Sequence, residues 1–134
     1  MINFSELRPG DYVQVDFEGQ RSTGVVTNLN HDEKQICVKN NVQEFWYDPA
    51  DVYPILLNDE SLMKLNFTKE KLPDGSVKYK KGVFRLVVPS ESDFSRVDMW
   101  YRDDIREHPE AKYIHQLQNL YTQMTKVHLT NEVI

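Results

Sequence analysis

The reactive side chains of this 134-residue chain are few and widely spaced. The single cysteine, Cys37, would need a neighbouring base and a lowered pKa to act as a nucleophile, and no histidine stands at a spacing that demands such a pairing. The histidines at 31, 108, 115 and 128 show no metal-ligand spacing and have no partner cysteines. We therefore expect no catalytic residue, no metal ligand and no cofactor, and interpret the chain as a non-enzymatic protein.

Positive charge gathers in residues 69–85, which hold six basic and two acidic residues. The basic members are Lys69, Lys71, Lys78, Lys80, Lys81 and Arg85. Lys78 and Lys80 alternate with Val77 and Tyr79, so they share the exposed face of a strand. A basic hairpin could neutralise phosphates, which makes nucleic-acid binding one alternative function. A solvated sheet edge, where lysines block aggregation, is the interpretation we favour.

Negative charge gathers in residues 91–110, which hold seven acidic and three basic residues. This surface could mimic nucleic acid and dock on a basic partner, so a phage inhibitor of a host protein is a further alternative. Arg96, Arg102 and Arg106 interrupt the stretch, which favours a solvated loop with local ion pairs. The whole chain has a net charge of −5, which argues against broad nucleic-acid binding.

The clearest pattern is an amphipathic helix over residues 113–124 with no charged residue in it. Its polar face carries His115, Gln118, Asn119 and Thr122, which are candidate protein-interaction residues because histidine and amides offer paired donors and acceptors. The favoured alternative is that these side chains bind the backbone of neighbouring strands or loops, since buried polar groups are normally satisfied in this way.

Trp100 is the fifth candidate interaction residue. The alternation in residues 96–101 places Val97, Met99 and Tyr101 inward and Trp100 outward. Aromatic side chains that stay exposed anchor protein interfaces, and Trp46 and Tyr101 are further candidates of this kind. We therefore expect an unidentified protein partner, while the oligomeric state stays open.

Short strands separated by turns fill the first part of the chain. Alternating apolar residues predict strands over 12–17, 24–29, 35–39 and 42–47, followed by a short strand near residue 53. Five such strands joined by tight turns indicate a small SH3-like barrel over residues 1–56.

The remainder, residues 57–134, is predicted to form a short helix, an antiparallel sheet and the C-terminal helix. Whether it shares one core with the barrel stays open. The short helix is expected over 59–65, with Asn58 as its N-cap. Strands are expected over 67–72, 77–80, 83–88 and 96–101, a charged loop over 102–110 and an edge strand or frayed tail over 126–134. The fold class is therefore α+β, mainly antiparallel β, with a sheet covered by the C-terminal helix.

Composition places the chain among ordinary globular proteins, with 40% hydrophobic and 28% charged residues. The N-terminus lacks the basic and apolar regions of a signal peptide, and no apolar run is long enough to span a membrane. A single cysteine fits a reducing compartment. We expect a cytoplasmic protein that does not associate with membranes.

Three segments together resemble a family of small proteins from Bacteroides-group bacteria and their phages and prophages. Residues 6–13, ELRPGDYV, are similar to the family's LRxGNxV start, residues 54–67, PILLNDESLMKLNF, to its PIPLTEExLLKxGF, and residues 112–121, KYIHQLQNLY, to its xYVHQLQNLY. Asp11 stands where the family usually has Asn, Asn66 where it has Gly, and residues 122–125 replace FALT. The resemblance implies a mobile-element origin and assigns no functional residue.

Overall fold

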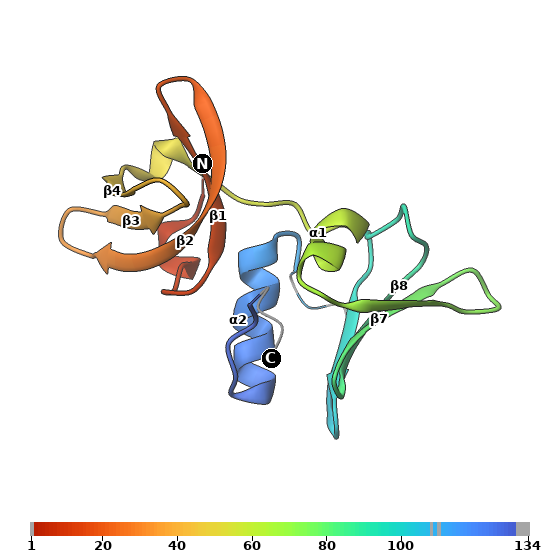
Figure 1. Cartoon of the computed structure of the whole chain (residues 1–134). Helices are drawn as coiled ribbons and strands as arrows, with labels where there is room; N and C mark the ends of the chain where they lie inside the picture. Colours follow the sequence, from red (N-terminus) through yellow and green to blue (C-terminus); the bar gives the residue numbers. More distant parts are fainter. Residues whose placement is uncertain (1, 108, 110, 131–134) are drawn as a thin grey trace. The chain divides into compact units, whose positions relative to one another are not determined.

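The computed structural model describes residues 2–107, 109 and 111–130. The chain divides into two compact units, which we call unit 1 (Met1–Ile55 and Tyr113–Asn119) and unit 2 (Leu56–Lys112 and Leu120–Ile134). Each unit contains one five-stranded antiparallel sheet, and Figure 1 shows the strands of unit 1 in red to yellow and those of unit 2 in green to cyan. The predicted α+β class, with mainly antiparallel strands and a C-terminal helix, is confirmed.

Unit 1 is a curled sheet with the strand order β4-β3-β2-β1-β5. Its strands are β1 (Tyr12–Phe17), β2 (Gln20–Asn30), β3 (Gln35–Lys39), β4 (Glu44–Tyr47) and β5 (Val52–Tyr53), with short 3-10 turns η1 (Phe4–Glu6) and η2 (Pro49–Asp51). The predicted strands are all present, and β2 is longer than expected. Alternate residues of β1 and β3, such as Val13, Val15, Ile36 and Val38, are buried in one core, as the period of two requires.

The SH3-like barrel is not confirmed, because no hydrogen-bonded pairing between the edge strands β4 and β5 closes the sheet in the described residues. The sheet is nevertheless strongly curled. In a flat sheet β1 and β4 would lie about 14 Å apart, yet the ring centroids of Phe17 and Phe45 are 5.5 Å apart. Gly24 permits tight packing within the sheet, since a Cβ atom there would lie 2.6 Å from Val38 Cγ1.

Unit 2 begins with a short helix and continues as a meander with the order β10-β9-β8-β7-β6. The elements are α1 (Asp59–Lys64), β6 (Thr68–Lys71), β7 (Val77–Lys81), β8 (Phe84–Val88), β9 (Asp98–Tyr101) and β10 (Asp104–Arg106). The prediction of α1 is confirmed: Asn58 accepts from the Ser61 N–H and the Ser61 hydroxyl accepts from the Asn58 N–H, both at 2.9 Å. Residues 104–106 form a strand, so the prediction of an irregular loop over 102–110 is wrong there; residues 108 and 110 lie outside the described residues.

One face of this second sheet is buried and the other is partly exposed. Tyr79, Leu86 and Met99 lie in register across β7, β8 and β9, and all three are buried. Phe84 on the same side contacts Tyr121 of the C-terminal helix, with ring centroids 4.8 Å apart. The predicted cover of the sheet by the helix is therefore present within unit 2.

The helix α2 (Ile114–Thr125) contributes residues to both units. Its first residues belong to unit 1, where the Ile114 N–H donates to the Ile55 carbonyl at 2.8 Å. The sequence had assigned the whole helix to the second region. After α2, residues 126–130 form no strand, while Leu129 is buried; the rest of the expected tail strand lies outside the described residues. No helix in the described residues has the length and apolar character needed to cross a bilayer.

Candidate functional site

The amide side chains at the start of α2 bind the main chain of the segment that leads into β1. Gln118, only 3% exposed, accepts a hydrogen bond from the Tyr12 N–H at 2.7 Å and donates one to the Gly10 carbonyl at 3.0 Å. Asn119 donates to the Glu6 carbonyl at 2.8 Å. These contacts pair partly buried main-chain groups of Glu6, Gly10 and Tyr12 with side chains of the helix.

His115 is also part of this internal network. Its side chain is 1% exposed, and Nε2 lies 3.1 Å from Glu6 Oε1, while Gln116 donates to Glu6 Oε2 at 3.0 Å. Burial raises the pKa of Glu6, but the hydrogen bonds from Gln116 and His115 outweigh it and leave the pKa below its ordinary value. The Tyr113 ring stacks on the His115 ring at a centroid distance of 5.9 Å.

These contacts correct the prediction of His115, Gln118 and Asn119 as residues that face a partner. The structure shows the alternative, in which the amides bind the backbone of a neighbouring segment, because the N-terminal part of α2 packs on unit 1. Thr122 lies in the part of α2 that belongs to unit 2 and is partly buried. The uncharged helix face is therefore mostly used within the fold.

Asp11 is a carboxyl group buried in the same network. It is 3% exposed and accepts hydrogen bonds from the Arg8 N–H at 2.9 Å and from the Asn119 side chain at 3.3 Å. Burial raises the pKa of Asp11 to about 7, because these hydrogen bonds only partly offset the loss of solvation. Asp11 is therefore partly protonated near neutral pH.

Much of the positive charge predicted for nucleic acid lies next to carboxylates of unit 2. Lys69 contacts Asp59 and Glu91, each at 3.1 Å; Lys71 lies 3.2 Å from Glu91. The side chains of Lys78 and Glu70 are 3.9 Å apart. Tyr79 donates to Asp59 at 2.6 Å and completes this network. The lysine side chains therefore stabilise unit 2 and offer less free charge than the sequence suggests.

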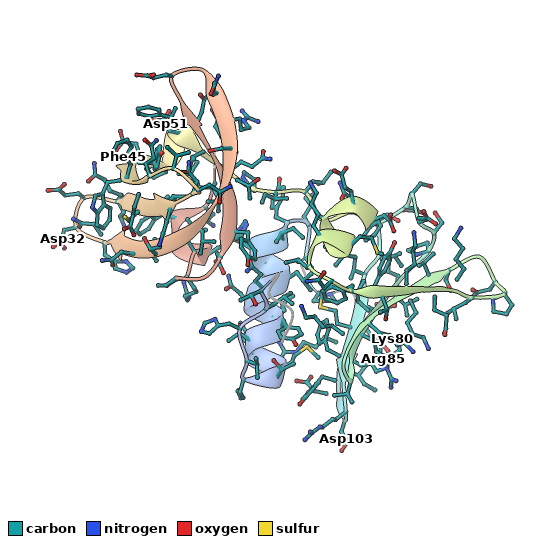
Figure 2. The ribbon with its side chains drawn as sticks, viewed as in Figure 1. Asp32, Phe45, Asp51, Lys80, Arg85 and Asp103 are labelled. Atoms are coloured by element: carbon teal, nitrogen blue, oxygen red, sulfur yellow. The ribbon has the colours of Figure 1, made fainter. Side chains whose placement is uncertain are left out.

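Lys81 points to the main chain and donates to the carbonyls of Leu65 and Thr130 at 2.8 and 2.9 Å. Burial lowers the pKa of Lys81. Lys80 and Arg85 pair across β7 and β8, and Arg85 pairs with Trp100 across β8 and β9. Figure 2 labels Lys80 and Arg85 near one another.

Trp100 lies on the face of the sheet opposite to buried Met99, as the alternation predicts, and it is partly exposed. The Arg85 guanidinium lies 5.0 Å from the centroid of its ring, within cation–π range. Lys80 and Arg85 of the basic segment thus form one row with Trp100 of β9, on the sheet face opposite to the buried residues.

The acidic stretch contains local ion pairs, as the favoured interpretation expected. Arg96 binds Asp98 at 3.1 Å, and Arg106 lies 3.3 Å from Asp104. The side-chain and backbone hydrogen bonds from Ser95 lower the pKa of Asp93, and the Ser95 N–H lies 2.9 Å from its carboxylate. Glu91, Asp98 and Asp104 of this stretch thus have basic partners.

A groove with a volume of about 520 Å³ opens at one end of unit 1. It lies between the β1–β2 turn, the start of β3, β4 and η2, and its lining comprises Asp16, Phe17, Glu18, Gly19, Gln35, Phe45, Trp46, Tyr47, Asp48 and Asp51. Figure 2 labels Phe45 and Asp51 in this region of unit 1 and Asp32 at the β2–β3 turn. The lining combines aromatic rings with carboxylates and contains no lysine or arginine.

The aromatic residues of this groove are unusually exposed for their size. Phe17, Phe45 and Trp46 are 42%, 43% and 46% exposed, and the rings of Phe17 and Phe45 contact each other. Both phenylalanines continue the core-facing alternation of Val15 and Tyr47 to the open end of the sheet, where the core ends. The groove therefore presents apolar rings to solvent beside negative charge.

Sequence reasoning named Trp46 as an exposed aromatic but missed Phe17, Phe45 and the carboxylates beside them. The run Phe45-Trp46-Tyr47 contains the missing signal: successive strand residues face opposite sides, so three aromatic residues in a row cannot share one core. The acidic side of the groove had no local signal, because Asp16 and Asp51 come together only through the pairing of β1 with β5, which places Val15 opposite Val52.

The groove holds neither the cysteine nor a recognised metal-binding cluster of the described residues. Cys37 is a buried free thiol, and no cluster of three or more histidine, cysteine or acidic residues in the described part of the chain has metal-binding geometry. Comparisons with protein-family models, with curated proteins and with solved structures gave no match. The candidate site therefore has to be interpreted from its own geometry.

We predict that Asp11→Asn stabilises the protein at pH 8. Folding raises the pKa of Asp11 to about 7, whereas in the unfolded chain Asp11 loses its proton at about pH 4. Between about pH 4 and about pH 7 the folded state therefore binds more protons than the unfolded state, and the stability of the wild type falls as the pH rises. Asn keeps an acceptor for Arg8 and Asn119 without a charge. Urea unfolding should show a gain on the order of 4 kcal/mol at pH 8, since folding raises the pKa by about three units and each unit corresponds to about 1.36 kcal/mol.

The pH dependence of this gain is the decisive part of the measurement. The difference between the variant and the wild type should shrink steadily towards pH 5, where Asp11 is protonated in the fold. Asp32→Asn, an exposed change of the same chemistry, is the control and should leave stability nearly unchanged. Equal gains at pH 5 and pH 8 would contradict the assignment of a buried, protonated Asp11.

Proposed function

We propose that this chain is a non-catalytic protein-interaction module that binds its partner at the unit 1 groove. The observation that carries the proposal is the set of exposed aromatic rings at the groove, with Phe17 and Phe45 in contact and both more than two-fifths exposed. Large aromatic side chains anchor protein interfaces when a partner covers them.

The shape of the groove supports the same proposal. It is an open depression at a sheet end, and it borders β4, an edge strand of the first sheet. A peptide segment of a partner can lie in such a depression and cover the rings, which removes apolar surface from water. The resemblance to proteins of Bacteroides-group phages and prophages adds a proposed mobile-element origin, with a host or phage protein as the partner.

A second candidate function is nucleic-acid binding through unit 2. The observation in its favour is the row of Lys80, Arg85 and Trp100 on one sheet face, where cations stand beside an aromatic ring. The ion pairs of Lys69, Lys71 and Lys78 reduce the positive charge around that row. Unit 2 has twelve acidic and twelve basic residues, so we rank this function second. The third alternative, a phage inhibitor that uses the acidic residues 91–110, ranks below both.

We predict that Phe45→Ala abolishes capture of a stoichiometric protein partner from a nuclease-treated Bacteroides lysate, because the change removes half of the contacting ring pair. The ring is already partly exposed, so the melting temperature should fall by only a few degrees. Capture is compared by quantitative mass spectrometry of wild-type and variant eluates.

Val42→Ala is the matched control for this experiment, since Val42 is the most exposed large apolar side chain described and does not line the groove. It should capture the partner as well as the wild type does. A partner retained equally by Phe45→Ala, or lost equally with Val42→Ala, would exclude the groove as the binding surface.

We predict that the second candidate fails a direct test. Single-stranded DNA and RNA should bind the protein with Kd values above the micromolar range at 50 mM salt, and Arg85→Gln should not change them. Tight binding with a steep salt dependence, weakened by Arg85→Gln and not by Arg21→Gln of unit 1, would instead establish nucleic-acid binding through the sheet of unit 2.

A further inference from the structure

We infer that the unit 1 groove receives a lysine or arginine side chain from a basic segment of a protein partner. This inference rests on the proposed function and adds the chemistry of the occupant. The groove combines the two features that recognise an organic cation: exposed aromatic rings and unpaired carboxylates.

The aromatic side of the groove can hold the cation by its charge and its aliphatic stem. The Phe17 and Phe45 rings are tilted by 49° at a centroid distance of 5.5 Å. Their exposed faces and edges give apolar surface for the methylene groups of lysine or arginine, while an aromatic face attracts a positive charge within about 6 Å. A partner side chain that covered the rings would gain both contributions.

The acidic side of the groove supplies charge complementarity. Asp16, Glu18, Asp48 and Asp51 line it, and among the described residues no lysine or arginine forms an ion pair with any of these four carboxylates. This contrasts with unit 2, where Asp59, Asp98, Asp104 and Glu91 have basic partners. Among the described residues, the side chain of Gln35 donates a long hydrogen bond to the Asp48 carboxylate, at 3.5 Å.

Arg21 is a basic residue close to the groove carboxylates in the strand pairing, but its guanidinium contacts an aromatic ring. Arg21 stands opposite Asp16 in the β1–β2 pairing, but its guanidinium lies 3.9 Å from the centre of the Tyr53 ring. The first 55 residues hold nine acidic and four basic residues, and residues 113–119 add none. The negative charge of the whole chain is therefore concentrated in the unit that contains the groove.

Other occupants fit this lining less well. A nucleic-acid strand would bring phosphates against four carboxylates, and a purely apolar segment would desolvate those carboxylates without compensating them. A basic peptide satisfies both sides of the groove at once. The carboxylates also raise the association rate of a positively charged segment at low salt.

The test uses four blocked heptapeptides, Gly-Ser-Gly-X-Gly-Ser-Gly, with Arg, Lys, Leu or Glu as X. Each is titrated into the ¹⁵N-labelled full-length protein at low salt, and backbone amide shifts are followed by NMR. The Arg and Lys peptides should shift the amides of residues 16–19 and 45–51 in a saturable way. The Leu and Glu peptides should leave these amides nearly unchanged, and residues of β7 to β9 should not respond to any of the four.

A matched pair of double variants separates local contacts from general charge. Asp16→Asn/Asp51→Asn removes two groove carboxylates, and Asp32→Asn/Glu33→Gln removes two exposed ones at the β2–β3 turn. The first should weaken binding of the Arg peptide about fivefold or more, while the second should change it less than twofold. Equal weakening by both variants would overturn the inference, because long-range attraction alone would then explain the binding.

The outcomes also distinguish this inference from the proposed function. Saturable shifts of the groove amides by the Leu or Glu peptide, at an affinity equal to that of the Arg peptide, would refute the cationic occupant and leave the interaction module intact. The same holds if none of the peptides shifts these amides while Phe45→Ala still abolishes capture of the partner. If the Arg and Lys peptides do not shift the groove amides and Phe45→Ala does not reduce capture of a partner, the inference and the proposed function are both rejected.

Discussion

The pair of hydrogen bonds made by Gln118 is the constraint on which the organisation of unit 1 depends. This one side chain joins residues more than a hundred positions apart, from the C-terminal helix to Gly10 and Tyr12 at the start of β1. The short strand β5 pairs with β1 at Gln14 and Val15, so the Tyr12 N–H needs an acceptor from elsewhere. The helix supplies it, together with the bonds of His115 and Asn119 to η1.

This use of the helix leaves its buried polar groups engaged inside unit 1. Amides and a histidine on a charge-free face look like a recognition surface, but buried polar groups cost free energy unless they are paired. Here the amides of Gln118 and Asn119 pair with the main chain of unit 1, and His115 pairs with the Glu6 carboxylate. The aromatic residues at the open end of the sheet have no such cover. The groove beside Phe45 presents exposed rings next to carboxylates that form no ion pair with a lysine or arginine of the described residues.

Local signals in the sequence predicted the secondary structure well. Alternation revealed the strands of both sheets, and Asn58 with Ser61 marked the start of α1. The strand Asp104–Arg106 was missed because its charged residues carry no apolar alternation; it forms by pairing with β9. The groove was largely missed for a similar reason: Phe17 and Phe45 lie far apart in the chain on non-adjacent strands, and only the curling of the sheet brings their rings together. The hydrogen-bond partners of Gln118 also depend on tertiary packing, which hydrophobic periodicity in the sequence does not reveal.

Amide hydrogen exchange of Tyr12 in the wild type and in Gln118→Ala is the measurement that most directly tests whether the helix face is used within the fold. We expect the Tyr12 N–H to be protected in the wild type and to exchange at least tenfold faster in the variant, while the amide of Met99 in unit 2 keeps its rate. An unchanged Tyr12 rate would contradict the account, because the polar face of α2 would then be available to a partner.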